Sequence, residues 1–402
     1  MMVGWKTKTL GEILVKAETI NPLLSPDVEF DYIDVSSVSN KTFSIEETQR
    51  LKGKDAPSRA RRQVRTNDII FATIRPTLQR IAIVPESLDQ QVCSTGYFVL
   101  RANSEVDHRF VFYSLFTKRF TDQMESLQKG ASYPAVTDGE VRAQLLSYPP
   151  LPEQERIVAI LDEAFAGIAT ARVNAKRNCQ NARALFESQV QSVVSQQGEG
   201  WLEKPLSDLC DIKHGYAFKS EFFTDEGDYV LLTPGNFYES GGYRDRGEKQ
   251  KYYYGDIPNA FILEEGDLLV AMTEQAAGLL GSPILVPESG RFLHNQRLGL
   301  VTQKAGLPWV NEFFFHVFNT QAVRKKIHDS ASGVKVRHTS PTKIGEVVVA
   351  FPASIDDQRS IVSKLEELQE ETQRLESLYQ RKLAVLDELK QSLLHQAFSG
   401  KL

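Results

Sequence analysis

The chain has 402 residues, of which 41% are hydrophobic and 25% charged, and its formal net charge is −5. These values exclude a disordered chain and a uniformly basic nucleic-acid coat, although they leave room for a local basic face. The three cysteines, Cys93, Cys179 and Cys210, are far apart, which excludes a disulfide framework and a cysteine metal site. No apolar run is long enough to span a membrane and no secretion signal is evident, so we expect a cytoplasmic protein.

The sequence repeats itself with a period of about 200 residues. Asp68-Ile-Ile-Phe-Ala72 is echoed by Asp267-Leu-Leu-Val-Ala271, and Gln154-Glu-Arg-Ile157 is echoed by Gln358-Arg-Ser-Ile361. Further matches occur in the same order at nearly the same spacing. The pattern predicts two copies of one unit, and the alternative is a duplicated stable domain without functional symmetry.

The first part of each copy has the pattern of a small α+β domain. Short β-rich runs such as Ile81–Val84 and Glu346–Ala350 lie between Gly, Pro and Asn turns. One helix is predicted near the end of each domain, at 109–127 and at 309–327.

The second part of each copy is predicted to be one long helix, at 151–198 and at 352–402. A proline and acidic residues open the first helix, and Gly198 and Gly400 follow the two patterns as helix-ending residues. Within these segments each helix would have roughly 43–45 residues and be about 65 Å long at about 1.5 Å per residue. Apolar or small residues recur at alternating steps of four and three, which is typical of a coiled coil. The positions are Ile157, Leu161, Ala164, Ile168, Ala171, Ala175, Asn178, Ala182 and Leu185, then Ile361, Leu365, Leu368, Thr372, Leu375, Tyr379, Lys382, Leu386, Leu389 and Leu393.

The connectivity predicts that the two helices run antiparallel, because the second begins where the domain that follows the first one ends. The alternative is an ordinary amphipathic helix packed on its own domain. The predicted fold is therefore α+β, with two globular α/β domains at 1–150 and 199–351. A pair of long antiparallel coiled-coil helices separates them, in a pseudo-two-fold internal repeat.

This architecture matches the symmetry of duplex DNA, because a dyad-related pair of domains can contact two half-sites. Basic residues cluster at 50–65 and 324–343, as phosphate contact requires, although solvated loops are the alternative. Glu274 is a candidate acceptor for cytosine, and the alternative is an ordinary exposed glutamate in a turn. The candidate DNA-binding residues are Arg59, Arg61, Arg62, Thr73, Arg75, Gln79, Arg80, Lys129, Ser132 and Tyr133 in the first domain, and Tyr216, Lys219, Arg244, Arg246, Lys251, Gln275, Lys335, Arg337, His338 and Thr339 in the second.

Sequence patterns of catalysis are missing. The chain has no phosphate-binding Gly-x-x-x-x-Gly-Lys loop, no Asn/Asp-Pro-Pro-Tyr tetrapeptide of amino-methyltransferases and no His-Glu-x-x-His pair. This favours a recognition subunit over an enzyme and predicts neither a metal nor a cofactor on this chain. The alternatives are a coiled-coil scaffold that binds proteins without touching bases, and a complete methyltransferase on one chain.

Four segments resemble the specificity (S) subunit of type I restriction–modification systems. They are Asp68–Pro76, Pro149–Ile157, Gly215–Lys219 and the ending Leu389–Leu402. The resemblance covers essentially the whole chain. It implies two target-recognition domains that each recognise one half of an asymmetric bipartite site, with the helices setting the spacer. It also implies two methyltransferase subunits that bring S-adenosylmethionine and methylate adenine, and two restriction subunits that use ATP and Mg²⁺, while the S subunit itself catalyses nothing.

Overall fold

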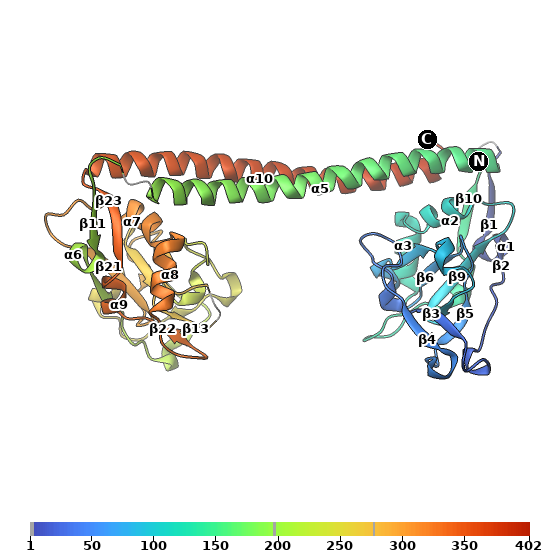
Figure 1. Ribbon diagram of the computed structural model, residues 1–402, viewed down its shortest axis with the longest axis horizontal. Coiled ribbons are helices and arrows are strands. Elements are labelled where there is room, and N and C mark those ends of the chain that lie inside the picture. Colours follow the sequence, from blue (N-terminus) through green and yellow to red (C-terminus); the bar gives the residue numbers. More distant parts are fainter. Residues whose placement is uncertain (1–3, 196–197, 276–277) are drawn as a thin grey trace. The chain divides into compact units, whose positions relative to one another are not determined.

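The computed structural model describes residues 4–195, 198–275 and 278–402 (Figure 1). Two long helices dominate the element order: α5 spans Leu151–Ser195 and α10 spans Ile355–Phe398. Both begin within a few residues of the predicted starts. The predicted end of the first helix at Gly198 follows residues 196–197, which lie outside the described residues. None of the described helices is long and apolar enough to cross a membrane.

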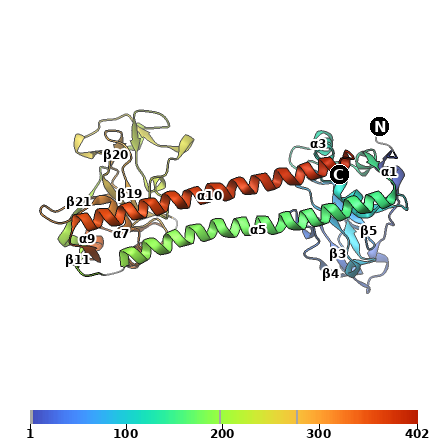
Figure 2. The same ribbon diagram turned by 90° about the horizontal axis from the view of Figure 1, so that it is seen from above.

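The two long helices run antiparallel (Figure 2). Arg156 of α5 donates a hydrogen bond to the backbone oxygen of Leu402 at 2.7 Å. Further along α5, Arg172 forms an ion pair with Asp387. The residue numbers rise on one helix and fall on the other, which fixes opposite directions. Both the antiparallel pair and the mixed helix-and-sheet fold are confirmed.

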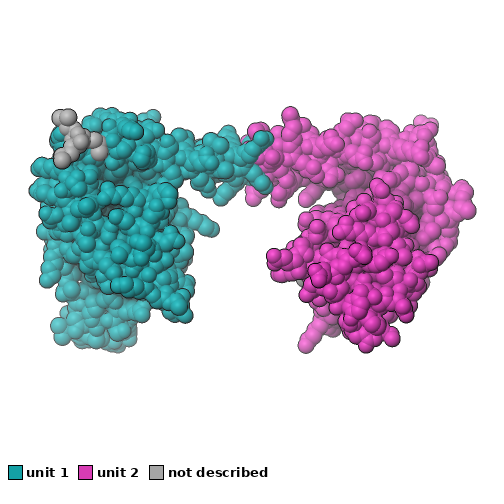
Figure 3. All heavy atoms as spheres, turned by 180° about the vertical axis from the view of Figure 1, so that it is seen from behind, with its two compact units in different colours: residues 1–177, 379–402 teal, residues 178–378 magenta. Residues whose placement is uncertain are grey.

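The chain divides into two compact units (Figure 3). Unit 1 comprises Met1–Arg177 and Tyr379–Leu402, and unit 2 comprises Asn178–Leu378. Each unit therefore contains one globular part together with segments of both long helices. In unit 2, for example, Arg183 near the end of α5 donates to Glu376 of α10 at 3.0 Å.

Unit 1 contains three sheets with strand orders β2-β9-β6-β7, β4-β3-β8-β5 and β1-β10. Helices α2 and α3 and the long helices cover a core that includes Phe71, Phe98 and Phe110, all at most 2% exposed. The bounds are β1 Lys6–Thr9, α1 Leu10–Ile13, β2 Leu14–Val15, β3 Glu29–Ile33, β4 Gln49–Lys52, β5 Ala60–Gln63, β6 Ile69–Ala72, β7 Ile81–Ile83, β8 Val92–Ser94, β9 Tyr97–Ala102, α2 His108–Ser114, α3 Lys118–Leu127, α4 Asp138–Arg142 and β10 Leu145–Tyr148.

Unit 2 repeats this order of elements, with sheets β12-β21-β17-β19, β13-β15-β14-β20-β16, β11-β23 and the short pair β18-β22. One parallel pair occurs in each unit, β3 with β8 and β14 with β20. The internal repeat is thereby confirmed. The bounds are β11 Trp201–Pro205, α6 Leu206–Leu209, β12 Cys210–His214, β13 Phe223–Thr224, β14 Tyr229–Leu231, β15 Tyr252–Tyr253, β16 Ile262–Leu263, β17 Leu268–Ala271, β18 Thr273–Glu274, β19 Pro283–Leu285, β20 Phe292–Leu293, β21 Leu298–Gln303, α7 Asn311–Phe318, α8 Gln321–Asp329, β22 Arg337–His338, α9 Pro341–Gly345 and β23 Val348–Pro352.

The single helix predicted near the end of each domain is wrong, because two helices stand there instead, α2 with α3 and α7 with α8. A threonine begins the second helix of each pair. The hydroxyl of Thr117 accepts a hydrogen bond from the Phe120 amide, and that of Thr320 accepts one from the Val323 amide, both at 3.4 Å. A hydroxyl in this position satisfies a free amide of the first turn, so it starts a new helix.

The predicted register holds along the first part of α5 and fails towards the C-terminal ends of both helices. On α5, Ile157, Leu161 and Ala175 are buried as predicted. Leu185 is 57% exposed, and Phe186 packs on the core of unit 2 in its place. The repeat-equivalent Leu389 of α10 is likewise 44% exposed. A helix end that packs on a globular core needs a wider apolar stripe than a coiled-coil seam, so the register shifts there.

Lys390 anchors the end of α10 to unit 1. Its ammonium lies 4.7 Å from the ring centre of Phe43, 5.5 Å from Phe116 and 5.3 Å from Phe165. Burial among these rings lowers the pKa of Lys390. Such contacts attract a cation to the negative ring faces.

Candidate nucleic-acid interface

Three of the basic residues between 50 and 65 form ion pairs within unit 1. Arg50 lies 2.8 Å from Asp31, Arg62 lies 2.7 Å from Asp138, and Arg65 lies 2.6 Å from Glu18. Arg61 donates to the carbonyl of its neighbour Ala60 at 2.8 Å. These contacts join segments of unit 1. The cluster therefore stabilises the fold in part and offers fewer free cations to DNA than its sequence indicates.

Lys52, Lys54 and Arg59 remain exposed, and their side chains have no hydrogen bond or ion pair with any residue that the structure describes. Of the basic residues between 50 and 65, these three are the ones best placed for phosphate contact.

Some basic residues of unit 2 likewise form internal hydrogen bonds, whereas others are exposed and unpaired among the described residues. The guanidinium of Arg324 turns inward and donates to the carbonyls of Leu280 and Glu239, each at 3.1 Å. Burial lowers the pKa of Arg324. Lys343 donates to the carbonyl of Ser330 at 2.7 Å. The side chain of Lys335 is exposed and has no partner within 4–195, 198–275 and 278–402.

Four of the predicted site residues face the protein interior or bind other segments. Thr73 is 6% exposed and its hydroxyl donates to the carbonyl of Gly96 at 3.0 Å. Arg80 donates to the carbonyl of Val38 at 2.7 Å, and Gln79 donates to Thr121. Thr339 is also 6% exposed. Thr73 and Thr339 are too buried to reach a base, and Gln79 and Arg80 are bound to other segments of unit 1, so we leave these four out of the proposed interface.

Two of the candidates at 216–251 lie beside aromatic side chains of unit 2. Tyr216 packs against Phe218 and Phe261, with ring centres 5.1 and 5.3 Å apart. The guanidinium of Arg244 lies 5.9 Å from the ring centre of Tyr238. The other three candidates in this range have different surroundings: Lys219 lies 3.9 Å from Glu221, Arg246 lies beside Gly235, and Lys251 is exposed.

Glu274 does not present its carboxylate to solvent, so the predicted contact with cytosine is wrong. The residue is 3% exposed. One carboxylate oxygen accepts hydrogen bonds from the amides of Gly278, Leu279 and Leu280 at 3.0–3.1 Å. Its role is to hold the loop that follows β18. Gln275, a predicted contact, is exposed at the start of that loop.

Two short loops carry most of the remaining candidates. We call them the tip loops: residues 130–134 in unit 1 and residues 333–337 in unit 2. Ser132 and Tyr133 lie in the first, where the guanidinium of Arg75 sits 5.2 Å from the ring centre of Tyr133. Lys335 and Arg337 lie in the second. Lys129 and His338 are at the edges of the two loops, and both are exposed.

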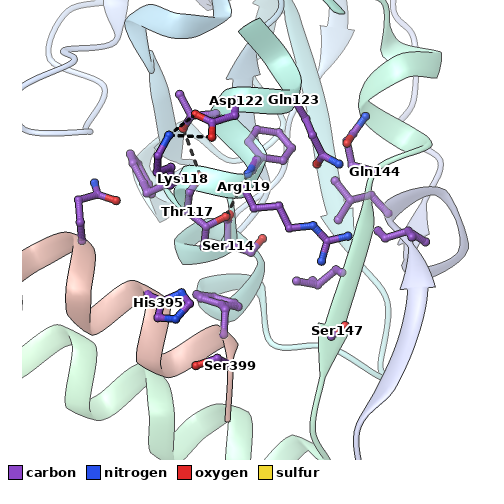
Figure 4. A pocket seen from close by; sticks show the side chains of 18 of the residues that line it. Ser114, Thr117, Lys118, Arg119, Asp122, Gln123, Gln144, Ser147, His395 and Ser399 are labelled. Carbon is purple, nitrogen blue, oxygen red and sulfur yellow. Dashed lines mark hydrogen bonds and ion pairs between the residues drawn. The ribbon is translucent and has the colours of Figure 1, made fainter. Parts of the chain in front are cut away.

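Unit 1 also contains a cavity of about 770 Å³, which sequence reasoning missed (Figure 4). Its walls come from α3, β10 and the last turns of α10, so residues as distant as Arg119 and His395 meet there. A salt bridge of 2.8 Å joins Lys118 to Asp122 at its edge. No group of three or more His, Cys, Asp or Glu residues that could hold a metal occurs in the described part of the chain. No sequence signal marks this cavity, because its walls are distant along the chain.

Comparison with known proteins gives a consistent result. A model of the family described as type I restriction modification DNA specificity domain matches residues 2–176 and again residues 198–383. The chain is 28% identical over 194 residues to the type I restriction enzyme HindI specificity subunit of Haemophilus influenzae, an alignment that covers 46% of this chain and 41% of the relative. It is 27% identical over 149 residues to the EcoDI specificity subunit of Escherichia coli, covering 37% of this chain and 32% of the relative. The alignments therefore span less than half the length of these curated relatives.

Two solved structures are similar to this chain over its full length. A chain in a structure of a type I R-M system matches with a TM-score of 0.85 and 26% identity, covering 100% of this chain and 99% of the other. The HsdS subunit of Thermoanaerobacter tengcongensis matches with a TM-score of 0.69 and 26% identity, covering 100% and 98%.

Proposed function

Because the chain belongs to the family of type I restriction modification DNA specificity domains, with one match in each half, we propose that it recognises an asymmetric, bipartite DNA site. Each unit binds one half-site. The chain confers sequence specificity, and partner subunits perform the chemistry.

The observation that carries this proposal is a backbone frame that both units share, with different residues at corresponding positions. The backbone position of Arg75 in unit 1 corresponds to that of Glu274 in unit 2, because each follows an equivalent β-bridge to the adjoining tip loop. Arg75 is exposed, whereas Glu274 is buried. A conserved frame with divergent contacts is what two different half-sites require.

The proposed protein partners are two methyltransferase subunits and two restriction subunits. The methyltransferase subunits supply S-adenosylmethionine and methylate adenine, and the restriction subunits use ATP and Mg²⁺. The long helices offer apolar side chains that this chain leaves exposed, including Val173 at 65%, Val385 at 59% and Leu378 at 50%. Apolar residues in this setting favour a protein partner over solvent.

The proposal is tested by mapping methylated adenines in cells with and without this gene, and by competition binding with the assembled complex. We expect one split motif to depend on the gene. Binding to that duplex should weaken steeply with salt and should resist scrambled competitors. A flat salt response without sequence preference would favour the protein scaffold. Binding of S-adenosylmethionine by the isolated chain would favour a single-chain methyltransferase.

We also propose that the long helices set the spacer between the half-sites. Deleting residues 172–178 of α5 together with the opposing residues 381–387 of α10 removes one heptad from each helix; the ion pairs Arg172–Asp387 and Arg183–Glu376 define this pairing. The loss of about 10 Å of helix corresponds to about three base pairs. Methylation mapping should show a spacer shortened by that amount with unchanged half-sites. An unaltered spacer would refute this role, and a variant with paired alanine substitutions over the same residues controls for lost surface contacts.

A further inference from the structure

The two tip loops share one backbone construction. Lys129 and Ala135 exchange two backbone hydrogen bonds of 2.9 Å across the first loop, and Ser332 and His338 exchange bonds of 3.0 and 2.9 Å across the second. Each pair encloses five residues. Each loop begins with a glycine of positive φ, 106° at Gly130 and 101° at Gly333. The same frame thus occurs once in each unit, in loops whose other residues differ.

The residues at the tips are exposed and chemically distinct. Tyr133 is 72% exposed in the first loop, and Val334 is 98% exposed in the second. The first loop has the sequence Gly-Ala-Ser-Tyr-Pro and the second has Gly-Val-Lys-Val-Arg. In Figure 1 the second loop projects from the surface of unit 2 beside β22. The frame therefore presents different side chains at the same place in each unit.

The second loop is held rigidly at its base. A Cβ atom on Gly333 would lie only 2.1 Å from the carbonyl oxygen of Val336, so the turn is too tight for another residue. Arg337 at the end of the loop pairs with Glu274 in the β18-β22 ladder and donates to the carbonyl of His328 at 2.6 Å. The buried carboxylate of Glu274 in turn fixes the adjoining segment. A loop fixed in this way loses little conformational entropy on binding.

Val334 has the chemistry to contact one feature of DNA. A single exposed valine is ordinary on a protein surface. Here, however, it is almost fully exposed on a loop whose base is held by backbone hydrogen bonds, next to Lys335, whose ammonium has no partner among the described residues. In the major groove the 5-methyl group of thymine is the apolar feature that a short aliphatic side chain can cover. The neighbouring ammonium suits the phosphate backbone.

We propose that the two tip loops are base-contacting elements, one for each half-site, and that Val334 packs against the 5-methyl group of a thymine. The inference deepens the proposed DNA recognition and rests on it. In the first loop Ser132 and Tyr133 contact the other half-site; by the shared frame Tyr133 stands at the position of Val336, and Ala131 stands at that of Val334.

The test uses the assembled complex and the duplex identified by methylation mapping, with each thymine replaced in turn by uracil, which lacks the methyl group. For the unmodified protein, one replacement in one half-site should weaken binding about three- to fivefold, the loss expected for one buried methyl. In Val334→Ala the ratio of affinities for thymine and uracil at that position should fall to about one.

Matched variants separate this contact from a general loss of binding. Val28 is 61% exposed and lies outside both tip loops, so Val28→Ala should leave every thymine-to-uracil ratio unchanged. Tyr133→Ala should relax only the half-site that Val334→Ala leaves intact. Lys335→Ala should weaken all duplexes equally and lower the salt dependence.

Three results would overturn the inference. Thymine-to-uracil ratios that stay unchanged in Val334→Ala would contradict the methyl contact. If Val334→Ala instead weakens binding equally for all sequences, the valine side chain inserts between base steps without recognising a thymine. A change of the same half-site by Tyr133→Ala and Val334→Ala would contradict the assignment of one loop to each half. If the unmodified complex itself prefers no sequence, the failure belongs to the proposed function and not to the loops.

Discussion

Replacing Leu394 with alanine should lower the unfolding free energy of unit 1 by about 2–5 kcal/mol, the range for removing a buried leucine side chain. Leu394 lies near the end of α10, is 1% exposed and belongs to the core of unit 1 together with Phe110 and Leu161. The truncation leaves a cavity between the last turns of the helix and the globular part. Denaturant unfolding should be followed by the fluorescence of Trp5, which packs 6.4 Å from Phe110. The other two tryptophans, Trp201 and Trp309, are replaced by phenylalanine for this purpose.

Leu389→Ala provides the matched control, because it makes the same chemical change one and a half turns earlier on the same helix. Leu389 is 44% exposed. Its removal should cost unit 1 less than about 1 kcal/mol, as is usual away from the core. Equal losses at the two positions would contradict the observed register of α10 and restore the one predicted from the heptads, in which Leu389 faces the partner helix.

Unit 2 should lose stability as the pH falls from about 6.5 towards 4, by roughly 3 kcal/mol for each of two buried histidines. His294 is 1% exposed and His316 is 8% exposed. Burial lowers the pKa of each to about 4. The unfolded chain therefore takes up protons near pH 6.5 that the folded unit does not bind until near pH 4. Because the unfolded state binds more protons in this interval, stability rises with pH and is fully present above the unfolded pKa.

The measurement compares denaturant unfolding at pH 7 and pH 5 in a Trp5→Phe background, where Trp201 and Trp309 report unit 2. Trp309 stacks on Phe314 at 3.5 Å, so its fluorescence should respond to unfolding. At pH 5 the loss should be about 2 kcal/mol for each histidine, and His316→Gln should remove its share of the pH dependence. If the unfolding free energy of unit 2 is the same at both pH values, the folded unit takes up as many protons between pH 7 and pH 5 as the unfolded chain does. Burial would then not lower the pKa of these imidazoles.

The long-range features of the fold could be predicted from the sequence because they depend on periodicity. A heptad pattern and a repeat of about 200 residues are visible without knowing any tertiary contact. The helix breaks were missed because the stretches around Thr117 and Thr320 contain no glycine or proline. One capping hydroxyl sets each boundary instead. The surface position of Leu389 was missed because the sequence does not indicate where a helix leaves its partner for a globular core.

The candidate site was harder to predict, because charge alone does not tell an internal contact from an exposed one. Arg62 binds Asp138, which lies 76 residues away, and Arg324 binds carbonyls that no sequence pattern marks. The heptad pattern places Lys390 on the helix surface, but in the structure its ammonium lies among three aromatic rings. The tip loops, by contrast, contain several of the predicted residues, since a glycine that follows a helical stretch marks a loop in the sequence.

The last turns of α10 complete the core of unit 1, which has a consequence for biosynthesis. A ribosome must add about 225 residues after Arg177 before Leu394, Ala397 and Phe398 can emerge and cover that core. At about 5–20 residues per second this takes roughly 10–45 s, during which the nascent first unit exposes apolar surface. A premature stop codon ahead of Leu394 would therefore damage the part of the protein that is translated earlier.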